Sequence, residues 1–321
     1  MFITPILLVT FNRPSYVGRV LEVIMQQKPQ NLYVFQDGVR TGNTTDLVTC
    51  PTVREVIEKH TTGTDTKLHT FFSDKNLGCG PGPAAAISWF FEHEEKGIII
   101  EDDAVPDLEF FDFAEEMLER YANDPTVMAI GSMNIDRHKW GEGSYYFSRM
   151  NRNLCAWATW RRAWTLKDLK MKDVSLCDLN GALRSYGCGI IEREYWKDRL
   201  REMHKNGMGN ASWDMQFFMS IWLRHGKGII PNVNLSSNIG TVGEATHSMQ
   251  AGNIIDNIPT SPILPINHPT DTSIQYEADK EFHYLYFEPG KAHWGKAKVF
   301  KYIINKRIKR LVGHTGPWIK R

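Results

Sequence analysis

The sequence predicts an α/β fold in which a mostly parallel central sheet is covered by helices on both faces. Two observations support this prediction. The first half of the chain alternates short apolar runs of strand length with amphipathic helical segments. The predicted strands are also apolar throughout, which is typical of strands buried on both faces of a parallel sheet.

Each element follows from its local pattern. Residues 6–9 form an apolar run, and Pro14-Ser15 then opens a helix with apolar residues at helical spacing. We expect further strands at 32–35, 68–72 and 97–100, with helices around 53–59 and from 83 to about 93 between them. After Asn134 the pattern becomes aromatic-rich and irregular, with helices near 191–205 and 213–225 and a short strand at 228–231.

The charge of the chain is divided unevenly. The 38 basic and 37 acidic residues nearly cancel, but residues 291–321 hold ten basic residues and no Asp or Glu. Residues 1–290 therefore carry 28 basic against all 37 acidic residues, a net charge of −9. Residues 297–312 also show apolar residues at helical spacing. The C-terminal segment is therefore predicted to be a basic amphipathic helix, which either lies on an anionic membrane surface or packs on the acidic body.

No run of residues reaches the ~20 consecutive apolar positions that a membrane-spanning helix needs. The five cysteines are scattered and lack the short paired spacings of zinc or redox motifs, as expected for reduced thiols. We therefore expect a cytoplasmic protein, peripheral at the inner face of the cytoplasmic membrane if it meets a membrane, with no nucleic-acid partner.

The predicted strands end in polar residues. In parallel sheets, ligands bind beyond the carboxyl ends of the strands, so these positions are the first candidates for a site. They comprise four short segments: Thr10-Phe11-Asn12-Arg13, Gln36-Asp37-Gly38, Ser73-Asp74-Lys75-Asn76 and Glu101-Asp102-Asp103.

Glu101, Asp102 and Asp103 carry the strongest local signal. Three adjacent carboxylates at the end of a buried strand repel one another and lose solvation, unless a cation or hydrogen-bond donors compensate. Mg²⁺ and Mn²⁺ prefer such oxygen ligands. The alternative is that the acids cap the helix expected after Pro106.

The glycine-rich segment 74–83 lies between a predicted strand and a predicted helix. Gly78 and its neighbours allow close approach of the backbone, and a helix N-terminus favours an anion such as a diphosphate. The segment is neither a Walker loop nor a dinucleotide fingerprint, and glycine-proline turns are common before helices. Asp37 and Arg13, taken singly, also fit turn or N-cap roles.

Asp214 and three tryptophans are candidates in the second half. Asp214 follows Trp213 at the start of an apolar helix, where it serves either the helix dipole or general-base catalysis. Trp157, Trp160 and Trp164 fall on one face if this segment is helical, which favours core packing, or alternatively an aromatic platform for a sugar or base. His247 lies in a loop-like context without a partner at metal-ligand spacing.

Together, these motifs resemble those of GT-A fold glycosyltransferases. The strand-end segments, including Asn76-Leu77-Gly78, are similar to the nucleotide-sugar-binding half of that fold, and Glu101-Asp102-Asp103 resembles its Asp-x-Asp motif as found in the Golgi N-acetylglucosaminyltransferases. Residues 155–164 and 234–247 are similar to bacterial nucleotide-diphospho-sugar transferases related to inverting family two. The resemblance implies a GT-A domain at 1–250, divided at 133/134 into nucleotide-sugar-binding and acceptor halves. A Pro-rich wrap or linker at 251–290 and the basic segment 291–321 would follow it.

The resemblance also implies roles for individual residues. Asp214 would be the catalytic base, Asp103 and His247 would bind Mn²⁺ or Mg²⁺, and the tryptophans Trp157, Trp160 and Trp213 would face the acceptor. The nucleotide-sugar would be bound by a set drawn from the strand ends: Thr10, Asn12, Arg13, Asp37, Lys75, Asn76, Gly78, Glu101 and Asp102.

The function expected from the resemblance is a metal-dependent, inverting glycosyltransferase of hexosyl or N-acetylhexosaminyl type. It would move a sugar from a UDP-linked donor to a hydroxyl of a glycan or lipid-linked acceptor, in bacterial surface polysaccharide synthesis. Two alternatives stay open. A sugar-1-phosphate nucleotidyltransferase uses a similar sheet, a nucleotide and Mg²⁺, although Met1–Pro14 lacks its glycine-rich loop. A non-catalytic carbohydrate- or polyanion-binding module would use the tryptophans and the basic segment.

Overall fold

The computed structural model describes residues 1–152, 154–206, 213–240 and 254–311. Within these residues the strands are β1 (Ile6–Thr10), β2 (Asn31–Gln36), β3 (Lys67–Phe72), β4 (Lys96–Glu101), β5 (Ala104–Pro106), β6 (Val127–Gly131), β7 (Tyr145–Ser148), β8 (Ala156–Trp160), β9 (Lys227–Pro231) and β10 (Ser236–Asn238). Eight of them form one sheet in the order β3-β2-β1-β4-β8-β6-β9-β7, while β5 and β10 form a small antiparallel pair. The strands β3, β2, β1 and β4 run parallel, and β8 and β7 run antiparallel to their neighbours.

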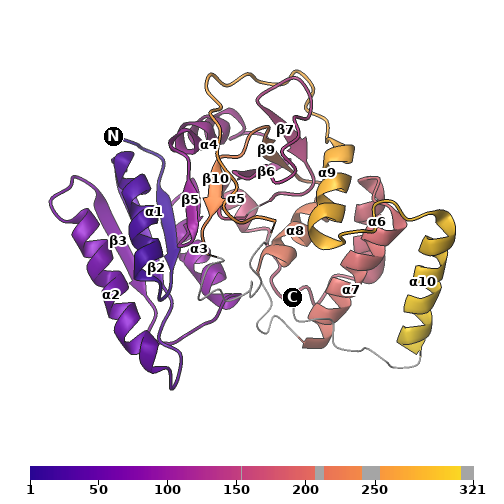
Figure 1. The fold of residues 1–321 in the computed structure, drawn as a ribbon, viewed down its shortest axis with the longest axis horizontal. Helices are drawn as coiled ribbons and strands as arrows, with labels where there is room; N and C mark the ends of the chain where they lie inside the picture. The colour runs from indigo at the N-terminus through magenta and orange to yellow at the C-terminus, as the bar shows by residue number, and fades with distance from the viewer. Residues whose placement is uncertain (153, 207–212, 241–253, 312–321) are drawn as a thin grey trace.

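Helices cover both faces of the sheet (Figure 1). Their bounds are α1 (Pro14–Gln26), α2 (Thr44–Thr61), α3 (Pro81–His93), α4 (Leu108–Arg120), α5 (Arg161–Trp164), α6 (Leu176–Ser185), α7 (Ile190–Asn206), α8 (Asp214–Trp222), α9 (Tyr276–Phe282), the π-helix η1 (His283–Phe287) and α10 (Lys296–Leu311). The predicted α/β class with a mostly parallel sheet is therefore confirmed.

The alternation of side chains along β1 divides the core into two layers. Leu8 packs in a cluster with residues of α1, α2 and α4, whereas Leu7 packs in a second cluster with residues of α3 and α8. Because both faces are buried, β1 carries no polar residue before Thr10. Proline at the first position of α1 supplies a backbone angle suited to a helix start, so the chain turns into α1 within four residues of the strand end.

The tryptophan segment forms a strand where the sequence pattern predicts a helix. Residues 156–160 form β8, which fills the place between β4 and β6, and only Arg161–Trp164 are helical. Spacings of three and four residues satisfy a helical face, but every residue of this short apolar run is buried. Periodicity cannot separate a buried strand from a buried helix in that case.

The C-terminal part of the described chain lies beside α6 and α7 (Figure 1). The predicted basic helix is observed as α10, and the residues before it form α9 and η1. Asp279 of α9 is fully buried, and it accepts hydrogen bonds from the Ser148 hydroxyl and from the Arg149 backbone N–H, the latter at 3.0 Å. No helix in the described residues is long and apolar enough to cross a membrane.

Candidate active site

The carboxyl ends of β1 and β4 form the candidate site. The two strands are adjacent and parallel, and Val9 of β1 lies opposite Glu101 of β4. From β1, successive strands lead outward to β2 and β3 on one side, whereas β4 lies on the other side. This reversal of strand order makes the β1/β4 crevice the topological switch point, where open α/β sheets bind ligands.

Arg13 joins the two strand ends. Its guanidinium pairs with the Asp102 carboxylate, and its Nη1 lies 3.2 Å from Oδ2 of Asp103. The other oxygen of Asp102 accepts a hydrogen bond of 3.3 Å from the backbone N–H of Phe11. Asp102 is 4 % exposed, so this carboxylate is held in place largely out of water. The sequence placed these groups on one edge of the sheet, and the structure brings them into contact.

The carboxylates of this cluster are strongly crowded. Burial, followed by repulsion from Asp103, Asp102 and Asp214, raises the pKa of Glu101 to about 8. Burial also raises the pKa of Asp102, to about 6, although Arg13 opposes the rise. Among the described residues, Arg13 therefore does not fully compensate the acids at the end of β4.

Asp103 offers a free ligand atom for a cation. Its Oδ1 is buried and accepts no hydrogen bond from the described residues. The carboxylate lies so close to Gly240 that a Cβ atom added to this glycine would come within 2.2 Å of Oδ2 of Asp103. Among the described residues no three acidic, His or Cys side chains converge as a complete metal site. A Mg²⁺ ion fits this arrangement because it typically uses one or two carboxylates and completes its shell with water and substrate phosphates.

Asp214 begins α8, as predicted, and lies near the same cluster. Its charge contributes to raising the pKa of Glu101. It also contributes, after burial, to raising the pKa of Tyr286 in the π-helix η1. The structure thus brings a residue of the second half and a residue of the C-terminal part close to β4. No sequence pattern singled out Tyr286, because a tyrosine in an aromatic-rich segment carries no motif.

Asp37 organises the glycine-rich loop. Its carboxylate accepts hydrogen bonds from the backbone N–H groups of Gly38, Leu77 and Gly78, at 2.8–2.9 Å, and from Nδ2 of Asn76 at 3.1 Å. Burial nevertheless raises its pKa, with these bonds opposing the rise. Gly78 adopts a φ of 85°, which glycine tolerates best. Asp37 and Asn76 thus shape the loop, and their contact with a nucleotide stays a prediction.

The other predicted donor-binding residues have observed partners. The Thr10 hydroxyl donates to the Phe35 carbonyl at 2.9 Å, and Asn12 Nδ2 donates to Asp46 Oδ1 at 2.8 Å. Both side chains therefore support the fold around β1, while Lys75 is exposed in the loop. Arg40 binds the buried Asp46 carboxylate through two nitrogens at 2.7 Å, a pairing that sequence patterns did not reveal.

The tryptophans predicted to face the acceptor, Trp157, Trp160 and Trp213, are buried in the structure. Trp157 is 0 % exposed, and Trp160 and Trp213 are each 4 % exposed. Trp157 stacks on Trp213 within the core layer formed with α3 and α8, with ring centroids 5.4 Å apart. These rings hold β8 against the helices and leave no flat surface for a sugar. His247, predicted to complete the metal site, lies outside the described residues.

Two further residues complete the surroundings of the acids. Cys155 is buried next to β8, and its carbonyl accepts a hydrogen bond of 3.1 Å from the Glu101 backbone N–H. Asn238 of β10 donates to the Cys155 sulfur at 3.5 Å. The β5–β10 pairing brings Asn238 opposite Ala104, and thereby sets Gly240 against Asp103. Such long-range pairing leaves no local signature in the sequence.

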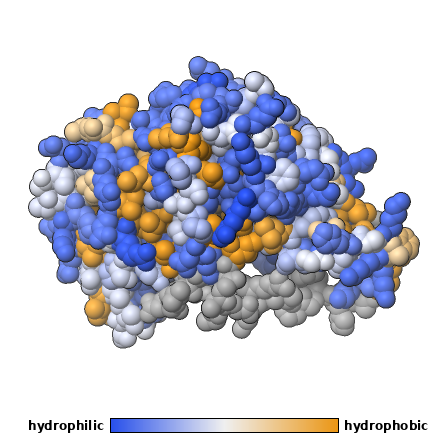
Figure 2. Space-filling model, turned by 45° about the horizontal axis from the view of Figure 1, so that its top comes forward, coloured by the Kyte–Doolittle hydropathy of each residue, from blue (hydrophilic) through white to orange (hydrophobic). Residues whose placement is uncertain are grey.

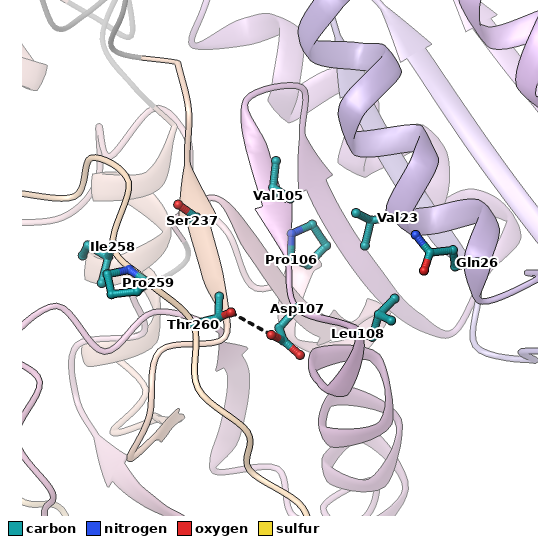
Figure 3. Close-up of a pocket in the computed structure, with 10 residues that line it drawn as sticks. All are labelled: Val23, Gln26, Val105, Pro106, Asp107, Leu108, Ser237, Ile258, Pro259 and Thr260. Atoms are coloured by element: carbon teal, nitrogen blue, oxygen red, sulfur yellow. Dashed lines mark hydrogen bonds between the residues drawn. The ribbon is translucent and has the colours of Figure 1, made fainter.

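A cavity of about 310 Å³ lies beside β5 (Figure 3). It is lined by Val23, Gln26, Val105, Pro106, Asp107, Leu108, Ser237, Ile258, Pro259 and Thr260. Its only ionisable lining group is Asp107, whose carboxylate caps α4 through the Glu109 N–H and accepts the Thr260 hydroxyl at 2.7 Å. Because the Asp107 carboxylate already accepts these hydrogen bonds, the cavity has no other ionisable lining group for catalysis.

Several solved structures are similar to this chain at low identity. A UDP-glucose pyrophosphorylase complexed with UDP-glucose is 10 % identical, covers 71 % of this chain and 90 % of its own, and has a TM-score of 0.38. A cytidylyltransferase from Leptospira borgpetersenii is 11 % identical over 64 % of this chain and 72 % of its own, with a TM-score of 0.31. The inositol-1-phosphate CTP transferase from T. maritima is 9 % identical over 52 % and 75 %, also at 0.31. Neither the family models nor the curated sequences compared with the chain give a match.

The prediction of a glycosyltransferase is corrected by these comparisons. The similar structures are named as a pyrophosphorylase and as nucleotidyl-transferring enzymes, which are not glycosyltransferases. A role in polysaccharide biosynthesis likewise finds no support, and of the two metals predicted, Mn²⁺ or Mg²⁺, Mn²⁺ finds none. Similarity at this level does not assign a reaction to this chain, which has to be inferred from the residues at β1 and β4.

Proposed function

We propose that this protein is a nucleotidyltransferase that joins a sugar 1-phosphate to a nucleoside triphosphate at the β1/β4 crevice. This is the first of the two alternatives that the sequence left open. The observation that carries the proposal is the carboxylate of Asp103, whose buried Oδ1 lacks a hydrogen-bond partner among the described residues while Oδ2 meets Arg13. A cation and an anionic substrate at this point would each meet a group of opposite charge.

Asp103 and Asp102 would hold the Mg²⁺ ion, which would supply positive charge at the phosphates when bound. Arg13 is the cationic side chain at the end of β1. Because Met1–Pro14 contains no glycine, the phosphates cannot be held there by a glycine-rich backbone loop. We infer that Arg13 takes over this role, since a guanidinium matches the geometry of a phosphate in two parallel hydrogen bonds.

In the proposed reaction, a phosphate oxygen of the sugar 1-phosphate attacks the α-phosphorus of the nucleotide. The new oxygen–phosphorus bond forms as the bond from that phosphorus to the bridging oxygen breaks, and pyrophosphate leaves with the electron pair. The attacking group is already an anion at neutral pH, so no general base is required. Such a reaction depends on positioning and charge stabilisation, which suits a site where the described residues supply carboxylates and the guanidinium of Arg13.

The test is a screen of nucleoside triphosphates against sugar 1-phosphates with Mg²⁺, measuring pyrophosphate release and identifying the nucleotide-sugar by mass spectrometry. Asp103→Asn is expected to lower the rate by at least about 100-fold, because a catalytic metal ligand loses its charge. The matched control is Asp65→Asn. Asp65 is exposed and precedes β3, so it lies at the amino ends of the parallel strands, away from the site at their carboxyl ends.

Two results would contradict the proposal. One is the absence of pyrophosphate release with every substrate pair. The other is an Asp103→Asn rate equal to that of the Asp65→Asn control. Calorimetry of nucleotide-sugar binding, with and without Mg²⁺, distinguishes the two ways in which the proposal can fail. Binding without turnover leaves the site in place and contradicts only this reaction, whereas absence of binding contradicts the site itself.

A further inference from the structure

Helix α10 carries an apolar stripe that faces solvent. Phe300 is 68 % exposed, Ile304 37 % and Ile308 52 %. Residues four apart lie one above the other on a helix, so these three side chains form one continuous row. Large apolar side chains exposed together, rather than singly, mark a surface that meets another apolar phase.

The opposite face of α10 holds the helix on the body of the protein. Ile303 is buried, and Nζ of Lys306 lies 2.6 Å from Oδ2 of Asp198 in α7. The Tyr302 hydroxyl donates to Oε1 of Glu288 at 3.2 Å. These contacts seat the helix beside α7 at the outer edge of the molecule (Figure 1).

A hollow of about 430 Å³ continues the apolar surface from α10 toward the start of α7. It is lined by Ile190, Trp294, Lys296, Val299, Phe300, Ile303 and Ile304. Ile190 is itself 43 % exposed. Figure 2 shows hydrophobic atoms among hydrophilic ones at the right-hand end of the molecule, the end at which α10 lies in Figure 1.

The charges around the stripe define what it can meet. Lys296 lies one turn before Phe300 on the same side of the helix, and Lys301 lies on the flank toward Ile304; both lysines are exposed. Residues 291–321 hold ten basic residues and no acidic residue. Apolar side chains bordered by lysines match an anionic lipid surface, where the apolar groups enter the acyl boundary and the ammonium groups stay among the phosphates.

We propose that α10 docks this protein on an anionic lipid bilayer through Phe300, Ile304 and Ile308, with Lys296 and Lys301 at the headgroups, while its other face stays on α7. The two alternatives raised by the sequence, a helix on lipid and a helix on the body, then apply to opposite faces of one helix. Docking in this way needs no unfolding of the C-terminal segment. It is also independent of the reaction at β1 and β4.

The test is co-sedimentation of the full chain with vesicles of phosphatidylcholine alone, and with vesicles in which a third of the lipid is phosphatidylglycerol. Binding is expected only with the anionic vesicles, and added salt should weaken it. Phe300→Ser with Ile304→Ser should lower the partition coefficient at least about tenfold, since two apolar groups no longer enter the lipid. Lys296→Gln with Lys301→Gln should lower it about 30-fold.

The matched control is Leu47→Ser with Val48→Ser on α2. These side chains are 62 % and 68 % exposed, and lie in another part of the fold. The control should bind as the wild type does, and thermal unfolding of each variant checks that the fold is kept. Equal binding to both kinds of vesicle, or equal loss in the control, would overturn the proposal. The proposal would also be overturned if the protein did not bind lipid and instead formed a dimer, measured by sedimentation velocity, that the Phe300→Ser and Ile304→Ser substitutions abolish.

Discussion

The substitution Glu101→Gln tests the charge crowding at the end of β4. Burial and the neighbouring carboxylates raise the pKa of Glu101 from its usual 4.5 to about 8. The folded protein therefore holds this proton more tightly than the unfolded chain does. The contribution of this group to the free energy of unfolding is complete below about pH 4.5, and is lost as the pH rises toward 8.

The size of the effect follows from the pKa difference. A change of one in pKa corresponds to about 1.4 kcal/mol, which gives roughly 5 kcal/mol as an upper limit. Because the Glu101 residue is partly exposed and solvent screens its charge, we expect about 2–3 kcal/mol between pH 5 and pH 8. Glutamine keeps the shape and cannot ionise, so the variant should lose this part of the pH dependence.

The assay is urea unfolding at several pH values without divalent cations, with tryptophan fluorescence as the signal. Glu92→Gln, which removes an exposed carboxylate on α3, is the control for a change in net charge. The reasoning is refuted if the difference in unfolding free energy between wild type and Glu101→Gln stays constant from pH 5 to pH 8. Mg²⁺ is expected to stabilise the wild type most at pH 8, because a cation offsets the ionised cluster.

Three further predictions concern the surroundings of the site. Arg13→Met should destabilise the protein by about 3 kcal/mol, since it leaves the buried Asp102 carboxylate unpaired, and calorimetry should show weaker nucleotide binding. Gly38→Ala should destabilise by about 2 kcal/mol in urea unfolding, because its Cβ would lie 2.4 Å from a backbone carbon of the glycine-rich loop. Arg40 lowers the pKa of Asp46 to about 2. The contribution of Asp46 to the free energy of unfolding is therefore lost as the pH falls from about 4 toward 2. Asp46→Asn should accordingly remove about 2 kcal/mol at pH 7 but little at pH 2, measured by thermal unfolding.

The parallel part of the sheet could be predicted from sequence because each element there leaves a local mark. Strands β1 and β4 are short apolar runs that stop at polar residues, and α1 begins at a proline and repeats its apolar residues at helical spacing. The rule that ligands bind at carboxyl ends then pointed to Arg13 and to the acids after β4. These two segments are adjacent in the structure because β1 and β4 pair directly.

The second half of the chain was harder to predict, because its pattern is ambiguous. Trp157 and Trp160 fit a helix by spacing, yet lie on a strand whose two faces are both buried. β8 also runs antiparallel between β4 and β6, an order that no local pattern encodes. The burial that makes these residues good core residues is the same property that removes their periodic signal.

The amino-acid sequence by itself determined the α/β class, the edge of the sheet where charged groups gather, and the basic amphipathic character of α10. These properties depend on residues close together along the chain. Only the tertiary structure decided that Arg13 pairs with Asp102 and Asp103, that Asp37 is occupied by the glycine-rich loop, and that α10 keeps one apolar face in solvent. Each of these depends on contacts between distant segments, whose geometry is set by strand pairing and packing rather than by local sequence.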